Sequence, residues 1–450
     1  MTIKSITIEK YKSFLEPVTI PFSPHFNVFI GPNNCGKTNI LDAIDFLAHP
    51  EKDPNRLHHP RTKIRMNVEL DAKERTQFKR GKNINVDGHE YSVDVSDEQG
   101  KRLQKKLYRH IASRIKMLSY EDFGDFVQIE KDYTALAQKY PRVFKRMMKL
   151  FQSYFPEVKA IEKIVDVKSD NFGTVALGSK SVTIARLGGG FRRILVILLY
   201  AFHPEYSALL IDEPEIHLHP GMIKKLIKGI TAGDTNQVIV TSHSPLFVSA
   251  YTLQHVYRVL KDEQGSHVYS LAQSGQHIDR QRLVQELNAD NLEMFFADKV
   301  LLVEGVSDRI LMRGLIDRFY EGPYDIKVIY THGKSNIDVY IDLMKTFHIP
   351  YVVMLDRDAL HNVAHNFGIR VRPHGKHNKN HRAYVYERLR EHHNIVVLDN
   401  GSIERNYPSK YQIKDSKPLN ALYAAANITR EEYFSPRLRN LRMVIEELAQ

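Results

Sequence analysis

The segment FNVFIGPNNCGKTNILDAIDFL, residues 26–47, restricts the possible folds of this chain more than any other. It reads as an apolar strand, a glycine-containing loop and a helix, and it matches the pattern G-x-x-x-x-G-K-[ST]. Such glycines let backbone N–H groups surround phosphates, the lysine reaches the β- and γ-phosphates, and the threonine hydroxyl binds Mg²⁺. The sequence therefore predicts an α/β fold with a P-loop ATP site. The residues assigned to the nucleotide are Gly31, Asn34, Gly36, Lys37, Thr38 and Asn39.

Two later apolar strands end in residues that a P-loop ATPase uses. The segment YSALLIDEPEIHLHP (206–220) brings Asp212, expected to hold Mg²⁺ through water, and Glu213, expected to polarise the attacking water. The segment VIVTSHSP (238–245) ends near His243, whose imidazole is placed to sense the γ-phosphate. The order of phosphate loop, acidic strand and histidine strand favours these roles over ordinary strand-end chemistry.

Three consecutive glycines, Gly188, Gly189 and Gly190, precede the strongly apolar segment FRRILVILLYAF. Together with the other motifs, this segment resembles the signature of ABC-type ATPases, closest to the branch of RecF, SMC proteins and the OLD (overcoming lysogenization defect) family. The resemblance implies a homodimer or higher oligomer in which these glycines face the γ-phosphate of the other protomer. It also implies that EIHLHP lies at the dimer seam, although the alternation of His217 and His219 leaves a zinc site open.

The remaining first half of the chain predicts a helical insert. Residues 101–160 carry apolar side chains at three- and four-residue spacing with basic residues between them. Core packing or a dimer contact is one interpretation, and a basic surface facing nucleic acid is the alternative. The insert is far too short for a long coiled-coil arm of the SMC kind.

Composition excludes several classes of protein. The single cysteine, Cys35, excludes an internal disulfide and a cysteine-based metal cluster. The longest apolar run, ILVILLYAF (194–202), is too short to cross a bilayer, and MTIKSITIEK lacks the apolar core of a signal peptide. We therefore expect a cytoplasmic protein without a membrane partner. A net charge of +11 mildly favours an anionic partner. The basic residues of 361–393 fit either a solvated segment or a nucleic-acid contact.

After residue 298 a β-α-β-α-β pattern begins, which predicts a second, parallel sheet with crossover helices. Its apolar runs KVLLV and YVVML both end in acidic residues, and a later strand is followed by SIE. Carboxyl ends of parallel strands meet at one edge of a sheet. Several carboxylates repel one another there unless cations neutralise them, so the pattern predicts a divalent metal site.

The combination of VEGVSD (303–308) with LDRD (355–358) resembles a Toprim domain. OLD-family nucleases join an ABC-type ATPase to a Toprim domain in one chain, so the resemblance covers nearly all 450 residues. It implies catalytic roles for Glu213, His243, Glu304, Asp356, Asp358 and Lys417. It implies metal ligands at Thr38, Asp212, Glu304, Asp308, Asp356, Asp358, Ser402 and Glu404. Lys410 and Lys414 are the nearby alternatives to Lys417.

This resemblance implies an ATP-hydrolysing endonuclease that uses Mg²⁺ or Mn²⁺ in a two-metal mechanism, with a role in defence against phage. The implied substrate is nucleic acid, DNA in the first instance with RNA left open. A second defence component, a helicase or a reverse transcriptase with its RNA, is an implied partner. Expected domains are the ATPase at 1–290, the Toprim nuclease at 296–420 and a helical segment at 421–450. Two alternatives are a RecF/SMC-like DNA-binding clamp with a non-catalytic Toprim scaffold and a topoisomerase-like enzyme with a covalent tyrosine.

Overall fold

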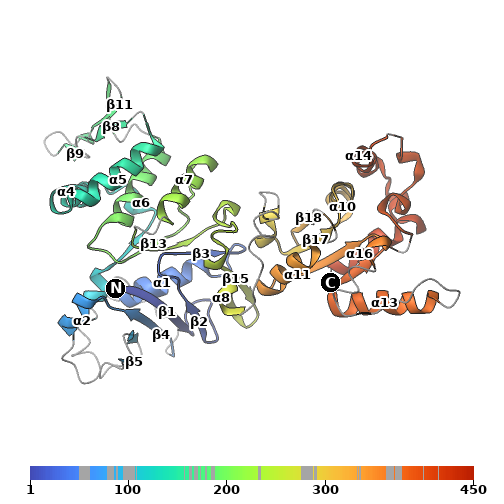
Figure 1. Ribbon diagram of the computed structural model, residues 1–450, viewed down its shortest axis with the longest axis horizontal. Coiled ribbons are helices and arrows are strands. Elements are labelled where there is room, and N and C mark those ends of the chain that lie inside the picture. Colours follow the sequence, from blue (N-terminus) through green and yellow to red (C-terminus); the bar gives the residue numbers. More distant parts are fainter. Residues whose placement is uncertain are drawn as a thin grey trace. The chain divides into compact units, whose positions relative to one another are not determined.

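The computed structural model divides into two compact units, residues 1–248 with 252–273 and residues 249–251 with 274–450 (Figure 1). The predicted boundary between the ATPase and Toprim domains, near residue 290, is flanked by residues that the structure does not describe. The predicted domain limits therefore stay predictions. The structure describes residues 1–49, 61–78, 86–87, 90–94, 107, 109–156, 158–161, 165–166, 171–172, 174–177, 180–183, 188–231, 235–274, 287, 291–331, 333, 336–360, 369, 378–398, 400–413 and 415–449.

A six-stranded sheet forms the centre of the first unit, in the order β16-β15-β3-β14-β13-β7. Five strands are parallel, and only β16 runs antiparallel to its neighbour β15. Every residue of β3, β13 and β14 is buried, because layers cover both faces of the sheet. The strands are β3 (Phe26–Ile30), β7 (Ile115–Leu118), β13 (Ala208–Ile211), β14 (Gln237–Thr241), β15 (Val256–Asp262) and β16 (Gly265–Ser270).

Helix α1 (Lys37–Ala48) packs against one face of this sheet and also contacts an antiparallel five-stranded sheet. Apolar side chains of both sheets and of α1 form one core. Helices α6 and α7 lie on the opposite face, with α4 and α5 packed on them (Figure 1). The antiparallel sheet consists of β1 (Thr2–Glu9), β2 (Val18–Pro21), β4 (Lys63–Glu69), β5 (Val86–Asp87) and β6 (Glu90–Asp94). The other helices are α2 (Ala72–Phe78), α4 (Phe126–Lys139), α5 (Pro141–Tyr154), α6 (Gly189–Phe202), α7 (Pro220–Ile230) and α8 (Leu271–Ser274).

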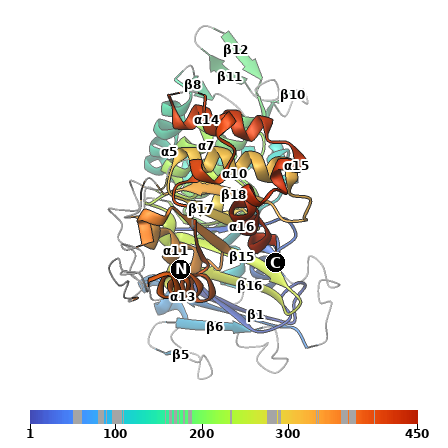
Figure 2. The ribbon, with the colours of Figure 1, turned by 90° about the vertical axis from the view of Figure 1, so that its right-hand side faces the viewer.

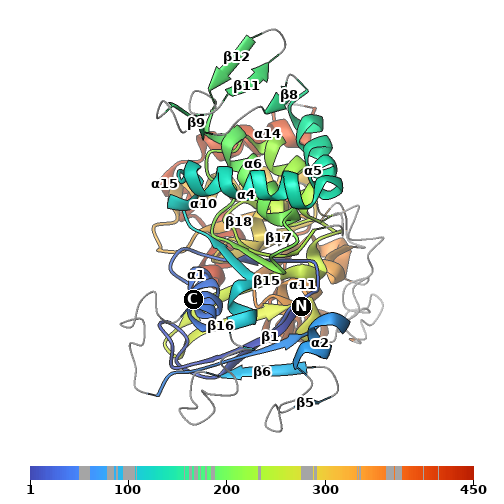
Figure 3. The ribbon, with the colours of Figure 1, turned by 90° about the vertical axis from the view of Figure 1, so that its left-hand side faces the viewer.

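The insert is only partly the helix that its periodicity predicts. Residues 115–118 form the edge strand β7, parallel to β13, so the helical expectation was wrong there. Long-range pairing outweighs local periodicity because β7 supplies backbone partners for the strand that carries the acidic motif. Helices α4 and α5 confirm the helical prediction further along, and Pro141 begins α5 at a position where its missing N–H costs nothing. Figure 3 shows the small sheet β12-β11-β8 beyond the end of α5. The short strands here are β8 (Val158–Ile161), β9 (Val165–Asp166), β10 (Asn171–Phe172), β11 (Thr174–Leu177) and β12 (Lys180–Thr183).

The second unit contains a parallel four-stranded sheet in the order β18-β17-β19-β20, as the β-α-β pattern predicts. Helices α10, α14 and α16 share a core with β17 and β19 (Figure 2). Its elements are β17 (Lys299–Val303), α10 (Val306–Phe319), β18 (Ile326–Tyr330), α11 (Ile337–Thr346), β19 (Tyr351–Leu355), α13 (Asn378–His393), β20 (Ile395–Val397), α14 (Lys417–Asn427), α15 (Arg430–Tyr433) and α16 (Arg439–Ala449). No helix in the described part of either unit is both long and apolar enough to cross a membrane.

Close contact between α10 and α14 depends on Gly314. A Cβ atom on Gly314 would lie 2.6 Å from the Cβ of Ala425. Overpacking costs about 1–3 kcal/mol, and the better helix propensity of alanine returns up to about 1 kcal/mol. We therefore expect Gly314→Ala to lower the free energy of unfolding by about 1–2 kcal/mol, measured by urea denaturation. In the Ala425→Gly protein the opposing Cβ is absent. Adding Gly314→Ala to that protein should therefore cost less than it costs in the wild type. A Gly314→Ala protein as stable as the wild type would contradict the close approach.

Candidate active sites

The phosphate loop uses glycine at two positions where no other residue fits. Gly31 has φ 144° and Gly36 has φ 105°, both in the region that L side chains rarely adopt. A Cβ on Gly31 would lie 2.2 Å from the carbonyl oxygen of Val259, and one on Gly36 would lie 2.4 Å from Ser13 Oγ. The loop therefore folds tightly against β15 and the segment that follows β1, which leaves its backbone N–H groups to surround an anion.

Lys37 is the first residue of α1, and its side chain turns back toward this loop. Its Nζ donates to the carbonyl oxygens of Gly31 (3.1 Å) and Pro32 (2.8 Å), and the residue is buried. Burial lowers the pKa of Lys37, although the nearby Cys35 and Glu213 oppose that shift. The lysine is thus held at the mouth of the loop, where its ammonium group can reach phosphate oxygens.

The two residues predicted to hold Mg²⁺ in the ATPase are in direct contact. Thr38 Oγ1 donates to Asp212 Oδ1 at 3.0 Å, and Thr241 Oγ1 donates to the same oxygen. Thr38 is in the first turn of α1, and Asp212 follows β13, so two elements far apart in the chain supply one oxygen cluster. A hydroxyl and a carboxylate are the donors that Mg²⁺ prefers, so the residues present fit this ion.

Glu213 and His243 meet beside that cluster. His243 Nε2 lies 3.2 Å from Glu213 Oε1. Burial and the charge of Lys37 lower the pKa of His243, so its imidazole is neutral near pH 7 and can donate to the carboxylate. One pocket includes most of the predicted nucleotide residues, and its lining consists of Lys12, Ser13, Asn33, Asn34, Gly36, Lys37, Thr38, Asn39, Glu213, His243 and Lys261.

Two residues that hold this site in place were given no role at the ATP site from the sequence. Arg193 on α6 donates to the carbonyl oxygens of Glu213 (2.7 Å) and Pro214 (3.1 Å). Glu215 Oε1 accepts from the Ser242 hydroxyl and the backbone N–H of His243, both at 2.7 Å. The pair Arg192 and Arg193 at the start of an otherwise apolar segment was the available sequence signal for the first, and Arg193 is 4 % exposed.

The three glycines of the signature-like segment lie at the start of α6 against the EIHLHP turn. A Cβ on Gly190 would lie 3.2 Å from the carbonyl oxygen of His217, whereas Gly188 faces open space. His219 caps α7, with its Nδ1 accepting from the N–H of Gly221 at 3.2 Å. The contact of these glycines with a second protomer stays a prediction.

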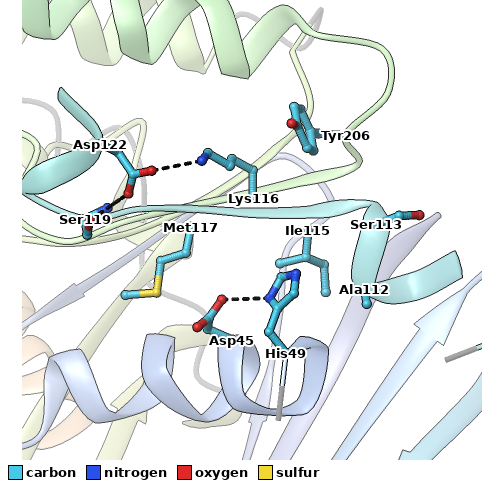
Figure 4. A pocket seen from close by; sticks show the side chains of 10 residues that line it. All are labelled: Asp45, His49, Ala112, Ser113, Ile115, Lys116, Met117, Ser119, Asp122 and Tyr206. Atoms are coloured by element: carbon cyan, nitrogen blue, oxygen red, sulfur yellow. Dashed lines mark hydrogen bonds and ion pairs between the residues drawn. The ribbon is translucent and has the colours of Figure 1, made fainter. Parts of the chain in front are cut away.

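A second pocket in the same unit follows the edge strand β7 (Figure 4). Its acidic side chains each contact a basic side chain: Asp45 Oδ1 lies 3.0 Å from His49 Nδ1, and Asp122 Oδ1 lies 3.0 Å from Lys116 Nζ. Because acids and bases neutralise each other here, this pocket has little attraction for a polyphosphate. The phosphate-loop pocket, with three lysines in its lining, is the better nucleotide site.

In the second unit, acidic residues meet at the carboxyl ends of β17 and β19. Glu304 Oε1 accepts from the backbone N–H of Asp356 at 2.7 Å, which ties the two strand ends together. Asp308 is 7 % exposed, and its Oδ2 accepts from the N–H of Gly305 at 3.0 Å. Burial and the negative charge of Asp356 raise the pKa of Asp308 to about 7.

Glu404 and Lys417 complete this cluster. Lys417 Nζ lies 3.1 Å from Glu404 Oε1, and the hydrogen bond raises the pKa of the lysine. Burial alone would raise the pKa of Glu404, but hydrogen bonds from Ser402 and Lys417 outweigh it and hold the pKa below its usual range. Lys410 instead pairs with Glu432 at 2.5 Å, and Lys414 lies outside the described residues.

The structure thus joins Glu304, Asp308, Asp356, Ser402, Glu404 and Lys417. Asp358 is exposed in the 3-10 helix η9 (Arg357–Ala359), and its role as a ligand stays a prediction. Over the described parts of the chain, no three His, Cys, Asp or Glu side chains are arranged to hold a metal ion. The donors are nevertheless all oxygens, the ligand type of Mg²⁺ and Mn²⁺, so their chemistry fits such ions.

Comparison with known proteins supports both units. Residues 26–249 match the family described as "AAA domain, putative AbiEii toxin, Type IV TA system", and residues 295–358 match "Overcoming lysogenization defect protein-like, TOPRIM domain". The chain is 23% identical over 441 residues to the OLD nuclease of Thermus scotoductus, a match that covers 79% of this chain and 82% of the relative. It is 24% identical over 201 residues to the Old nuclease of Escherichia phage P2, covering 40% of this chain and 34% of that protein.

A solved structure, the SmcHead bound to the C-winged helix domain of ScpA, aligns with a TM-score of 0.43 and 16% sequence identity. It covers 61% of this chain and 99% of that structure. The two matched domains stand in the order that the motifs predict, a P-loop ATPase first and a Toprim domain second. The chain therefore joins a P-loop ATPase domain to an OLD (overcoming lysogenization defect)-like Toprim domain, and over both domains it is similar to OLD nucleases.

Proposed function

We propose that this protein hydrolyses ATP and cleaves nucleic acid as a divalent-metal-dependent endonuclease. The observation that best supports the proposal is the cluster of Glu304, Asp308, Asp356, Glu404 and Lys417 at the carboxyl ends of a parallel sheet. Acidic turns of ordinary structure do not need a buried carboxyl group beside two further carboxylates. The same chain carries a P-loop with its acidic and histidine strands in contact.

In the ATPase unit, the chain's own residues provide binding and proton handling. The loop N–H groups and Lys37 would bind the β- and γ-phosphates, and Thr38 with Asp212 would hold a magnesium ion. Glu213 orients and polarises the attacking water, while neutral His243 contacts Glu213 and faces the same pocket. Binding of ATP would position or gate the nuclease, because phosphodiester hydrolysis is itself downhill and needs no energy from ATP.

In the Toprim unit, Glu304, Asp308, Asp356 and Glu404 would hold the divalent ions, with Asp358 and Ser402 as further ligands by resemblance. Bound there, one ion would activate the attacking water and a second would stabilise the leaving oxygen. Lys417 supplies a positive charge that stabilises the developing charge on the scissile phosphate or protonates the leaving oxygen.

Further parts of the proposal have their support in the family resemblance. They are DNA as the first substrate with RNA as the alternative, a homodimer or higher oligomer, a role in defence against phage, and a second defence component. The names of the relatives from Thermus scotoductus and Escherichia phage P2 agree with a nuclease. The positive net charge of +11 agrees with an anionic substrate.

The test is cleavage of supercoiled plasmid by the purified protein in Mg²⁺, in Mn²⁺ and in chelator, each with and without ATP. Wild-type protein should cut only with metal, and Asp356→Ala should not cut. The Lys37→Ala protein shows whether nucleotide promotes or restrains cutting. Failure of the wild type to cut plasmid, single-stranded DNA or RNA in any metal would overturn the nuclease proposal.

A second function is a DNA-binding ATPase clamp whose Toprim fold is only a scaffold. One observation favours it: the described acidic residues contain no ready-made set of three metal-binding side chains. The clamp predicts metal-independent DNA binding that depends on ATP, without cleavage, and an Asp356→Ala protein that keeps every activity of the wild type.

A further inference from the structure

Arg193 fixes the backbone at the end of the acidic strand. The residue is 4 % exposed, and its guanidinium lies over the ring of Phe123, 4.2 Å from the centroid, and donates to the carbonyl oxygens of Glu213 and Pro214. Glu213 itself has φ 47°, a left-handed conformation that residues other than glycine rarely adopt. Two hydrogen bonds from a buried cation are a physical reason for this conformation to persist.

Glu215 fixes the other side of the same site. Its Oε1 accepts from Ser242 Oγ and from the N–H of His243, both at 2.7 Å. Its Oε2 is buried with no hydrogen-bond partner among the described residues. Burial lowers the pKa of Arg193, and the charge of Glu215 is the main influence that opposes this shift. Arg193 and Glu215 carry opposite charges, and each fixes the backbone of one residue of the pair Glu213 and His243. The side chains of Glu213 and His243 lie 3.2 Å apart.

We propose that Arg193 and Glu215 are positioning residues for ATP hydrolysis, with Arg193 acting through the backbone of Glu213 and Glu215 acting through His243. The inference rests on the proposed ATPase function. Neither residue lines the nucleotide pocket, so binding of ATP does not need them. The direction of the Glu213 carboxylate follows its backbone, and a misplacement of about 1 Å in a reacting group can cost about 100-fold in rate.

The test measures kcat and KM for ATP, together with the Kd of a non-hydrolysable ATP analogue, for Arg193→Met, Arg193→Lys, Glu215→Ala and Glu215→Gln. We expect Arg193→Met and Glu215→Ala to lower kcat by about 10- to 100-fold while Kd changes by less than about 3-fold. Glu215→Gln should keep most of the rate, because its carbonyl oxygen still accepts from Ser242 and His243. Arg193→Lys should be intermediate, because one ammonium replaces the planar fork.

Arg114 provides a matched control at the N-terminal end of β13, the strand that Glu213 follows at its other end. It donates to the carbonyl oxygens of Pro204 (2.8 Å) and Glu205 (2.7 Å), just before β13. Arg114→Met should therefore lower the melting temperature as Arg193→Met does, but leave kcat within about 2-fold of the wild type.

Three results would decide against the inference. The first is equal kcat values for Arg193→Met and Arg114→Met, and the second is a loss of analogue binding at unchanged kcat. The third is equal rates of hydrolysis in Glu215→Ala and Glu215→Gln. If Arg193→Met does not fold, Arg193→Lys and the two Glu215 variants give the same comparison. A wild-type protein that does not hydrolyse ATP would instead overturn the proposed ATPase function. That result comes from the measurement on the wild-type protein alone.

Discussion

Replacing Lys417 by methionine should lower metal-dependent cleavage by about 100- to 1,000-fold, the usual effect of removing one group that stabilises transition-state charge. The physical reason is the position of its ammonium group, 3.1 Å from Glu404 and within electrostatic reach of Asp356 and Asp308. Methionine keeps the length and the apolar stem of the side chain but not the charge. The measurement is the initial rate of plasmid cutting at saturating Mg²⁺ or Mn²⁺.

Lys410 is the matched control for this change. Both lysines are exposed and both pair with a glutamate, but Lys410 pairs with Glu432 instead of a member of the acidic cluster. Lys410→Met should therefore cut within about 2-fold of the wild type, since an exposed ion pair contributes little. Equal losses in the two variants, or no loss in Lys417→Met, would show that Lys417 does not serve the reaction. Binding of Mn²⁺ should persist in Lys417→Met, because lysine is not a metal ligand.

The Glu213→Gln protein should bind ATP but hydrolyse it about 100- to 10,000-fold more slowly, the range expected for loss of a general base. Glutamine keeps the size of the side chain and an oxygen that can accept from His243, but it cannot take a proton from water. Phosphate release at saturating ATP measures the rate, and a fluorescent ATP analogue measures binding.

Glu16→Gln is a suitable control, because Glu16 is exposed and pairs with Lys10 away from the pocket lining. A Glu213→Gln protein with wild-type turnover would show that another group activates the water. If hydrolysis stops as expected, the variant accumulates with ATP bound. Size-exclusion chromatography of that species, compared with Lys37→Ala, then tests whether the predicted homodimer or higher oligomer depends on bound ATP.

The sequence predicted the parts of this molecule whose chemistry is local. Gly31, Gly36 and Lys37 stand in one short loop, and the strands before Asp212 and Glu304 are apolar because both faces of a parallel sheet are covered. The resemblance to OLD nucleases followed from the order of these motifs, and the two matched domains confirm it.

Features that depend on pairing between distant segments could not be predicted in this way. Residues 115–118 have a helical pattern but form β7, because β13 is their partner and no local signal encodes it. The contact between Lys417 and Glu404 also needed the fold, since the packing of α14 brings these two residues together. Arg193 and Glu215 act on backbone groups, which every residue carries, so no residue type marks their targets.

The place of α14 in the chain has a consequence for how the protein is made. Glu304 and Asp356 leave the ribosome well before Lys417, and α16, which covers the same face of the sheet, follows later still. Until both helices are available, the core that they share with α10, β17 and β19 is incomplete, and the acidic cluster has no lysine. We therefore expect nascent and C-terminally truncated chains to be inert toward the nucleic acid around them, so that cleavage activity arises only in a finished polypeptide.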